Sequence, residues 1–181
     1  MAVSRREAFL RQARSDFALF NHLRDQDQAT MPACHPLHYL QMAAEKLAKA
    51  IFDALGVSID PWSHVAFSNL PYHLARADIA RAIGFRDSRS FRTFLRRCAP
   101  IFRAIDELSP AVGASRSGGG PRQGPNVEYP WESRDANGRT TWLVPAENEF
   151  KLLAQFQRAG DAAQVLKLIR TLLDRFEANF G

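Results

Sequence analysis

Residues 38–52 read HYLQMAAEKLAKAIF, and this stretch decides the fold class. Its apolar residues return at three- and four-residue steps, which is the period of one face of an α-helix. The pattern predicts a helix from about Pro36 to Leu55 that ends at Gly56, a residue suited to the left-handed position after a helix. Its expected buried face consists of Leu40, Ala43, Ala44, Leu47, Ala50, Ile51 and Leu55.

Two charged residues of this helix fall outside the apolar face. Glu45 and Lys49 are four residues apart, so we expect them to pair on the solvated side, where such a pair contributes about 0.2–0.5 kcal/mol. The alanines of the apolar face permit a neighbouring helix to approach closely.

The same apolar period recurs along most of the chain. Ser4 followed by Glu7 is a capping box, which predicts the start of a first helix that ends near Gln26. The other expected helices are residues 71–83, opened by Pro71; a helix of about 20 residues capped by Asp87 or Ser88 and kinked at Pro100; residues 145–159; and a last helix from Asp161.

Two segments depart from the helical pattern. Residues 111–126, AVGASRSGGGPRQGPN, are rich in Gly, Ser and Pro and predict a flexible loop. Residues 127–144 contain two β-prone runs around Asn137-Gly138, which favour a short hairpin with a type I′ turn or an irregular excursion. We therefore predict a single all-α domain over residues 1–181, a bundle of four to six helices.

Composition excludes several classes of protein. The chain has 181 residues, of which 46% are hydrophobic and 24% charged, a globular balance that argues against a disordered chain. No apolar run approaches the roughly 20 residues of a membrane helix, and two cysteines make no disulfide framework. We expect a cytoplasmic protein without membrane contact.

The basic charge is unevenly distributed. The net charge is +5, carried by 20 arginines and only 4 lysines. Eight arginines and two acids lie between Arg76 and Arg103, a local balance of +6. Arginine binds phosphates through planar, bidentate donors, although such a run also occurs on helix faces that only meet solvent. The predicted nucleic-acid-binding residues are Arg86, Arg89, Arg92, Arg96, Arg97 and Arg103.

Aromatic residues near the predicted hairpin offer a second kind of contact. Tyr129, Trp131 and Trp142 can stack on nucleobases or pack into the core, and the sequence favours packing. Among the histidines, His35 and His38 stand at the start of the second helix and fit end-of-helix roles or acid–base contact with RNA. Neither has the spacing of a zinc site, and we predict no metal and no cofactor.

The second helix resembles the signature of the HEPN family, the higher eukaryote and prokaryote nucleotide-binding domains. The resemblance is carried by a Gln, small residues, Glu-Lys and Leu-x-Lys-Ala, which here are Gln41, Ala43, Ala44, Glu45, Lys46, Leu47, Lys49 and Ala50. Tyr129-Pro130 is similar to a dipeptide that family members often have before their last helix. The resemblance implies a helical bundle of four to five helices that forms a homodimer.

The family also implies classes of function. Many members are metal-independent ribonucleases or toxins of prokaryotic defence and toxin–antitoxin systems, often beside a nucleotidyltransferase, and others are inactive interaction modules. The catalytic signature of the family is an Arg followed by four to six residues and a His, and none of the five histidines here has such an arginine. The leading interpretation is therefore an RNA-associated or protein-associated module of such a system.

Two alternatives stay open. One is a metal-independent endoribonuclease that combines His35 or His38 with an arginine of the helix over residues 86–103, since RNA cleavage needs a general base and a cation at one phosphate. The other is a dimerisation or scaffold protein that uses the small-residue helix face and does not bind nucleic acid.

Overall fold

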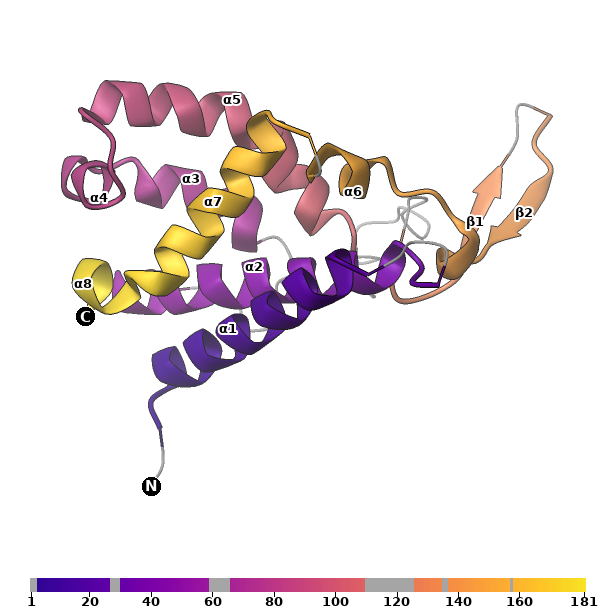
Figure 1. The fold of residues 1–181 in the computed structure, drawn as a ribbon, viewed down its shortest axis with the longest axis horizontal. Helices are drawn as coiled ribbons and strands as arrows, with labels where there is room; N and C mark the ends of the chain where they lie inside the picture. The colour runs from indigo at the N-terminus through magenta and orange to yellow at the C-terminus, as the bar shows by residue number, and fades with distance from the viewer. Residues whose placement is uncertain (1–2, 27–29, 59–65, 110–125, 135–136, 157) are drawn as a thin grey trace.

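Helices make up most of the protein in the computed structural model, and a short hairpin projects from one end (Figure 1). The structure describes residues 3–26, 30–58, 66–109, 126–134, 137–156 and 158–181. The elements in chain order are α1 (Arg5–Arg24), α2 (Cys34–Ala54), α3 (Ala66–Leu74), α4 (Ala77–Ala82), α5 (Ser88–Asp106), β1 (Trp131–Arg134), β2 (Thr140–Leu143), the 3-10 helix η2 (Pro145–Glu147), α6 (Lys151–Phe156), α7 (Asp161–Asp174) and α8 (Phe176–Phe180).

Helices α1 and α2 form an antiparallel pair at the base of the molecule (Figure 1). The predicted N-cap is confirmed, because the Ser4 hydroxyl accepts a hydrogen bond of 3.2 Å from the Glu7 amide. Between the helices, the buried Asp16 carboxylate accepts hydrogen bonds of 2.8 Å from Lys46 and from Gln12. This ion pair joins the two helices beside their apolar contact.

Helix α2 is the centre of the bundle, because it packs against α1, α3, α5 and α7. Its predicted apolar face is buried except for Leu55, which is half-buried after the end of the helix, and Gly56 adopts the expected left-handed conformation with a φ of +66°. The predicted pairing of Glu45 with Lys49 is confirmed, but their expected place on the solvated side is wrong. Both side chains are buried, and the Lys49 Nζ lies 2.5 Å from Glu45 Oε1, because helices cover α2 on the side that its period assigns to solvent.

Helix α3 also differs from the prediction. Pro71 does not open a helix but lies within α3, which begins at Ala66 and ends at Leu74. The apolar stripe of Phe67, Leu70 and Leu74 runs across the proline and packs against α5, so tertiary burial places the helix start upstream of it. The expected continuation to residue 83 is a separate short helix, α4.

Helix α5 agrees closely with the sequence pattern. The Asp87 carboxylate caps it by accepting a 2.7 Å hydrogen bond from the Ser90 amide, and Pro100 lies inside it. Its apolar stripe is buried and consists of Phe91, Phe94, Leu95, Cys98, Phe102 and Ile105. Because both cysteines of the chain, Cys34 and Cys98, are buried, burial raises the pKa of each thiol, to about 11 for Cys98.

A hairpin is confirmed before the C-terminal helices, with different bounds from those expected. The first strand is Trp131–Arg134, and its last pair joins residue 134 to Thr140, so the strands are not joined by the expected two-residue turn. Val127 lies before this strand and is buried in the core, and its amide donates a 2.9 Å hydrogen bond to the Leu108 carbonyl. The predicted loop over residues 111–126 lies outside the described residues except for Asn126.

The C-terminal segments are shorter than predicted. The expected helix from Pro145 is divided into η2 and α6, and the last helix is interrupted at Arg175 between α7 and α8. Helix α7 crosses the bundle and packs against α5 (Figure 1). In the described ranges, no helix is both long and apolar enough to span a membrane.

The buried Glu45–Lys49 pair provides a test of this core. Lys49→Met leaves the Glu45 carboxylate buried without its ammonium partner, and we expect it to lower the free energy of unfolding by about 3–5 kcal/mol. Glu45→Gln with Lys49→Met removes both charges and keeps an oxygen for the Gln41 amide, which donates 2.9 Å to Glu45.

Urea unfolding at neutral pH measures this double variant and the two single variants, Lys49→Met and Glu45→Gln. We expect the double variant to be more stable than Lys49→Met alone, since it buries no unpaired charge. A double variant that loses as much stability as the sum of the single variants would contradict a coupled buried pair.

Candidate nucleic-acid interface

A groove lies between α3 and α5 on the surface of the bundle, with a volume of about 320 Å³. It contains three of the predicted arginines. Its lining residues are Ser68, Pro71, Tyr72 and Ala75 from α3 and the residue after it, and Arg92, Leu95, Arg96, Ala99 and Arg103 from α5. The groove therefore combines an apolar floor with a cationic edge.

The cationic edge is formed by Arg92, Arg96 and Arg103. Their spacing of four and seven residues places them on one side of α5, and all three are exposed. Within the described residues, none of them has a hydrogen bond or ion pair to a carboxylate. Their guanidinium groups are therefore available for an anionic ligand, and planar guanidinium groups match the oxygens of a phosphate.

The aromatic residue of the groove is Tyr72, on the opposite wall. Its exposed fraction is 83%, the highest among the large hydrophobic side chains that the structure leaves at the surface. No other ring among the described residues stacks on it, so its face is free. An exposed aromatic face beside a cationic edge is the arrangement by which proteins bind single-stranded nucleic acids, with bases stacked on rings and phosphates on cations.

A partly buried hydrogen bond joins α3 to α5 beside the groove. The backbone amide of Ser68 donates a 2.7 Å hydrogen bond to Asp106 Oδ2, and the Asp106 residue is 5% exposed. Burial raises the pKa of Asp106 to about 6, and the nearby charge of Glu45 contributes to this rise. Hydrogen bonds from Ser68 to the carboxylate act in the opposite direction and lower the pKa, but by less than burial raises it.

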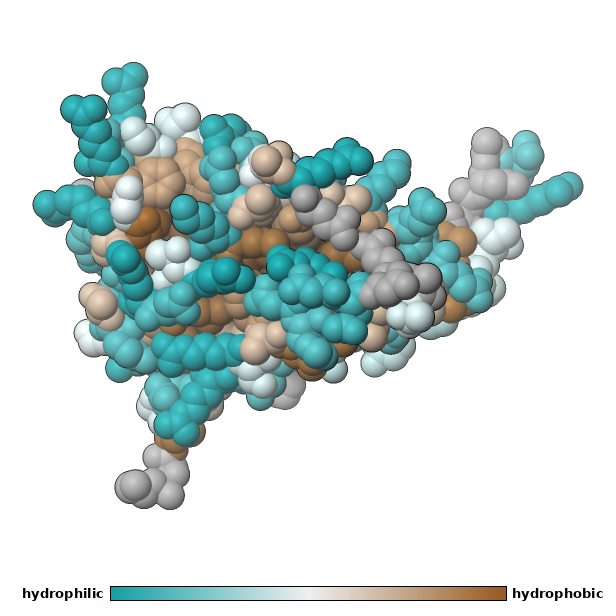
Figure 2. Space-filling model, viewed as in Figure 1, coloured by the Kyte–Doolittle hydropathy of each residue, from teal (hydrophilic) through white to brown (hydrophobic). Residues whose placement is uncertain are grey.

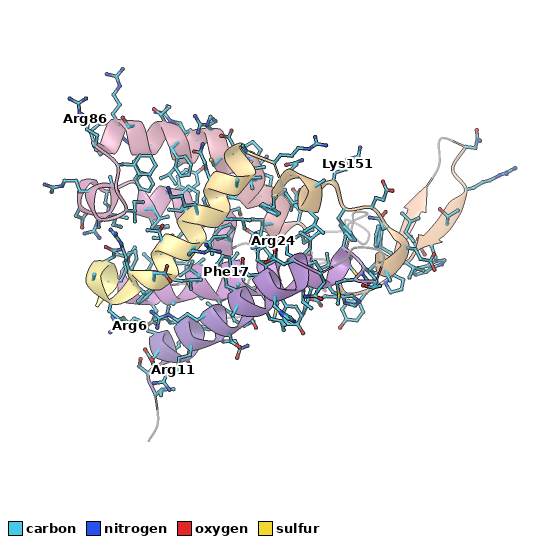
Figure 3. The ribbon with its side chains drawn as sticks, in the orientation of Figure 1. Arg6, Arg11, Phe17, Arg24, Arg86 and Lys151 are labelled. Atoms are coloured by element: carbon cyan, nitrogen blue, oxygen red, sulfur yellow. The ribbon has the colours of Figure 1, made fainter. Side chains whose placement is uncertain are left out.

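The other predicted arginines do not line this groove. Arg97 is held on the α7 side of α5, where its Nε lies 2.7 Å from Asp161 Oδ1 and its Nη2 donates 3.0 Å to Gln164 Oε1. Arg89 lines a separate groove on that same side, and Arg86 projects from the connection before α5 (Figure 3). Five of the six arginines thus divide between two sides of α5, and Arg86 precedes this helix.

The predicted histidines also lie elsewhere. His35 is exposed at the start of α2, and neither His35 nor His38 lines the groove. His38 Nδ1 lies 3.2 Å from Glu128 Oε1, at ion-pair distance but without hydrogen-bond geometry, and Ser109 donates to the same oxygen. The combination of either histidine with an arginine at one phosphate stays a prediction.

The part of the chain that the structure describes contains no group of three His, Cys, Asp or Glu residues able to hold a metal ion.

The three aromatic residues near the hairpin, for which the sequence left stacking or packing open, differ in their exposure. Tyr129 and Trp142 are exposed, against the favoured packing, whereas Trp131 is half-buried with its ring 6.3 Å from that of Phe150. Tyr72, which sequence reasoning missed, stands in the groove. The sequence could have indicated that Tyr72 is exposed. In a helix that begins at Ala66, Tyr72 lies outside the apolar stripe of Phe67, Leu70 and Leu74.

No family model, curated protein or solved structure matches this chain. The resemblance to the HEPN family is therefore carried by the motif of α2 and stays an expectation.

The pKa of Asp106 predicts a pH dependence of stability. The folded state raises this pKa above its ordinary value near 3.8, so it binds more protons than the unfolded state between about pH 4 and pH 6. The stability that this group contributes is therefore fully present below about pH 4 and is lost as the pH rises through 6, a change of about 2–3 kcal/mol.

The matched variant is Asp106→Asn, which has no charge to desolvate and keeps an oxygen that accepts from the Ser68 amide. Urea unfolding from pH 4 to pH 7 should show Asp106→Asn gaining stability relative to the unsubstituted protein as the pH rises. Parallel stability curves for the two proteins would show that Asp106 does not titrate in this window.

Proposed function

We propose that this protein is a nucleic-acid-associated helical module that holds a single RNA strand in the groove between α3 and α5. The observation that carries the proposal is the meeting of Arg92, Arg96 and Arg103 with the free face of Tyr72 across an apolar floor. The arginines neutralise phosphates, and Tyr72 stacks on a base. From the HEPN-like motif of α2 we further propose that this module serves a prokaryotic defence or toxin–antitoxin system, as a homodimer or beside a nucleotidyltransferase.

The dimensions of the groove favour an unpaired strand over a duplex. A volume of about 320 Å³ is at the lower end of small-molecule sites, which is room for one base with part of its sugar. A base in a duplex is stacked on its neighbours and does not offer its face to Tyr72.

The primary test is fluorescence anisotropy of a labelled single-stranded RNA titrated with the protein at several salt concentrations. Arg92→Ala with Arg96→Ala should weaken binding and lower the slope of log K against log salt by about 0.7 for each phosphate that is no longer neutralised. Arg11→Ala is the matched control, since Arg11 is exposed on α1 and pairs only with Glu7 among the described residues. Equal slopes for all variants would contradict an arginine site on α5.

A second variant tests stacking separately from charge. Tyr72→Ala should weaken binding of single-stranded RNA by about 1–3 kcal/mol without changing the salt slope, because it removes a stacking face and no cation. Tyr72→Phe should retain the affinity, and Trp142→Ala should have no effect because this exposed aromatic lies on the hairpin. Loss of affinity with Trp142→Ala and not with Tyr72→Ala would move the stacking site to the hairpin.

A further inference from the structure

A second groove lies on the other side of α5, between α5, α7 and the connection after α4. It consists of two adjoining depressions of about 370 Å³ each, which share Phe85, Phe94 and Gln164 in their lining. Figure 2 shows hydrophobic surface near the α4–α5 end of the molecule, flanked by hydrophilic side chains. This groove shares no lining residue with the one between α3 and α5.

The wall of this α5/α7 groove is held in a defined conformation. Gly84 takes a φ of +91°, and its amide donates 3.0 Å to the Arg81 carbonyl, while the Phe85 amide donates 2.8 Å to the Ala80 carbonyl. These two hydrogen bonds form a Schellman motif that ends α4. Arg175 donates to the Ala82 carbonyl and so ties this end to the C-terminus of α7. The groove is therefore built from fixed elements.

The floor of the α5/α7 groove is apolar but offers no free aromatic face. The ring of Phe85 packs 4.8 Å from Phe91 and 5.2 Å from Phe94, and Leu168 of α7 is buried beside them. The rings pack against one another, unlike that of Tyr72. Such a floor suits an aliphatic or aromatic side chain that enters between the helices, and it does not suit stacking by nucleobases.

The rim of the α5/α7 groove is cationic. Its lining includes Arg89, Arg97 and Lys167 and no carboxylate. Arg97 is neutralised by Asp161, and Arg89 lies near the exposed Asp87. Lys167 is exposed on α7 and has no carboxylate partner among the described residues. A ligand that places acidic groups over the rim meets opposite charge at both helices.

We propose that the α5/α7 groove binds an acidic segment of a partner protein, with an aliphatic or aromatic anchor over Phe85 and Phe94 and carboxylates toward Arg89 and Lys167. An apolar floor with charged groups at its edges is the arrangement of grooves that take amphipathic peptide segments. The proposal does not depend on RNA binding, because the two surfaces share no lining residue.

The test uses a display library of random linear peptides, selected on the full-length protein. We expect the selected peptides to be enriched in Asp and Glu around one aliphatic or aromatic residue. Their affinity should fall roughly tenfold or more for Arg89→Glu with Lys167→Glu, since reversed rim charges repel acidic groups. Both residues are exposed, so we expect the variant to fold, which circular dichroism verifies. Arg92→Glu with Arg96→Glu, the matched control on the other side of α5, should leave peptide affinity unchanged.

Three outcomes would overturn the proposal. One is a set of selected peptides with no excess of acidic residues, and another is peptides that bind the Arg89→Glu, Lys167→Glu variant as tightly as the unsubstituted protein. The third outcome is that this variant weakens single-stranded RNA binding as much as the Arg92→Glu, Arg96→Glu control does, which would assign the groove to nucleic acid. Retained RNA binding together with a loss of peptide binding supports two separate surfaces.

Discussion

The hydrogen bond from the Ser68 amide to the buried Asp106 carboxylate helps to hold α3 against α5, and the groove between these two helices depends on that position. Helix α3 has only nine residues and contains a proline, so it would not be stable alone in water. It is held by apolar packing on α2 and α5 and by hydrogen bonds to the Asp106 carboxylate at the end of α5. Because α3 supplies one wall of the α3/α5 groove, the geometry of that groove follows from a carboxylate that burial makes expensive to ionise.

The elements that could be predicted from the sequence are those whose apolar period agrees with a strong local signal. Helix α5 has both, in the Asp87 cap and in a stripe that is buried throughout, and the glycine after α2 adopts the expected conformation. The Glu45–Lys49 pair could not be predicted, because periodicity identifies one apolar face and says nothing about a helix that is surrounded on the other side as well.

The candidate site was predictable in part for a similar reason. The spacing of Arg92, Arg96 and Arg103 places them together, and the structure confirms that they line one groove. Nothing in the local sequence indicates that Arg97 is committed to Asp161, a residue 64 positions further along the chain, or that Tyr72 stands opposite the arginines. Both facts depend on how α3 and α7 pack on α5, which is tertiary information. Strand pairing likewise moves the first strand to Trp131–Arg134, past the β-prone residues 127–131, whereas the second strand begins at Thr140 as expected.

Both native thiols are enclosed in the bundle, which has a practical consequence. Cys34 and Cys98 are 2% and 0% exposed, and burial disfavours the thiolate form that reacts with maleimides and iodoacetamides. A cysteine introduced at an exposed position of α5 or α7 would then be the one fast-reacting thiol in the folded protein. The native sequence is therefore a suitable background for attaching a single fluorophore or spin label, without first removing either of its own sulfhydryl groups.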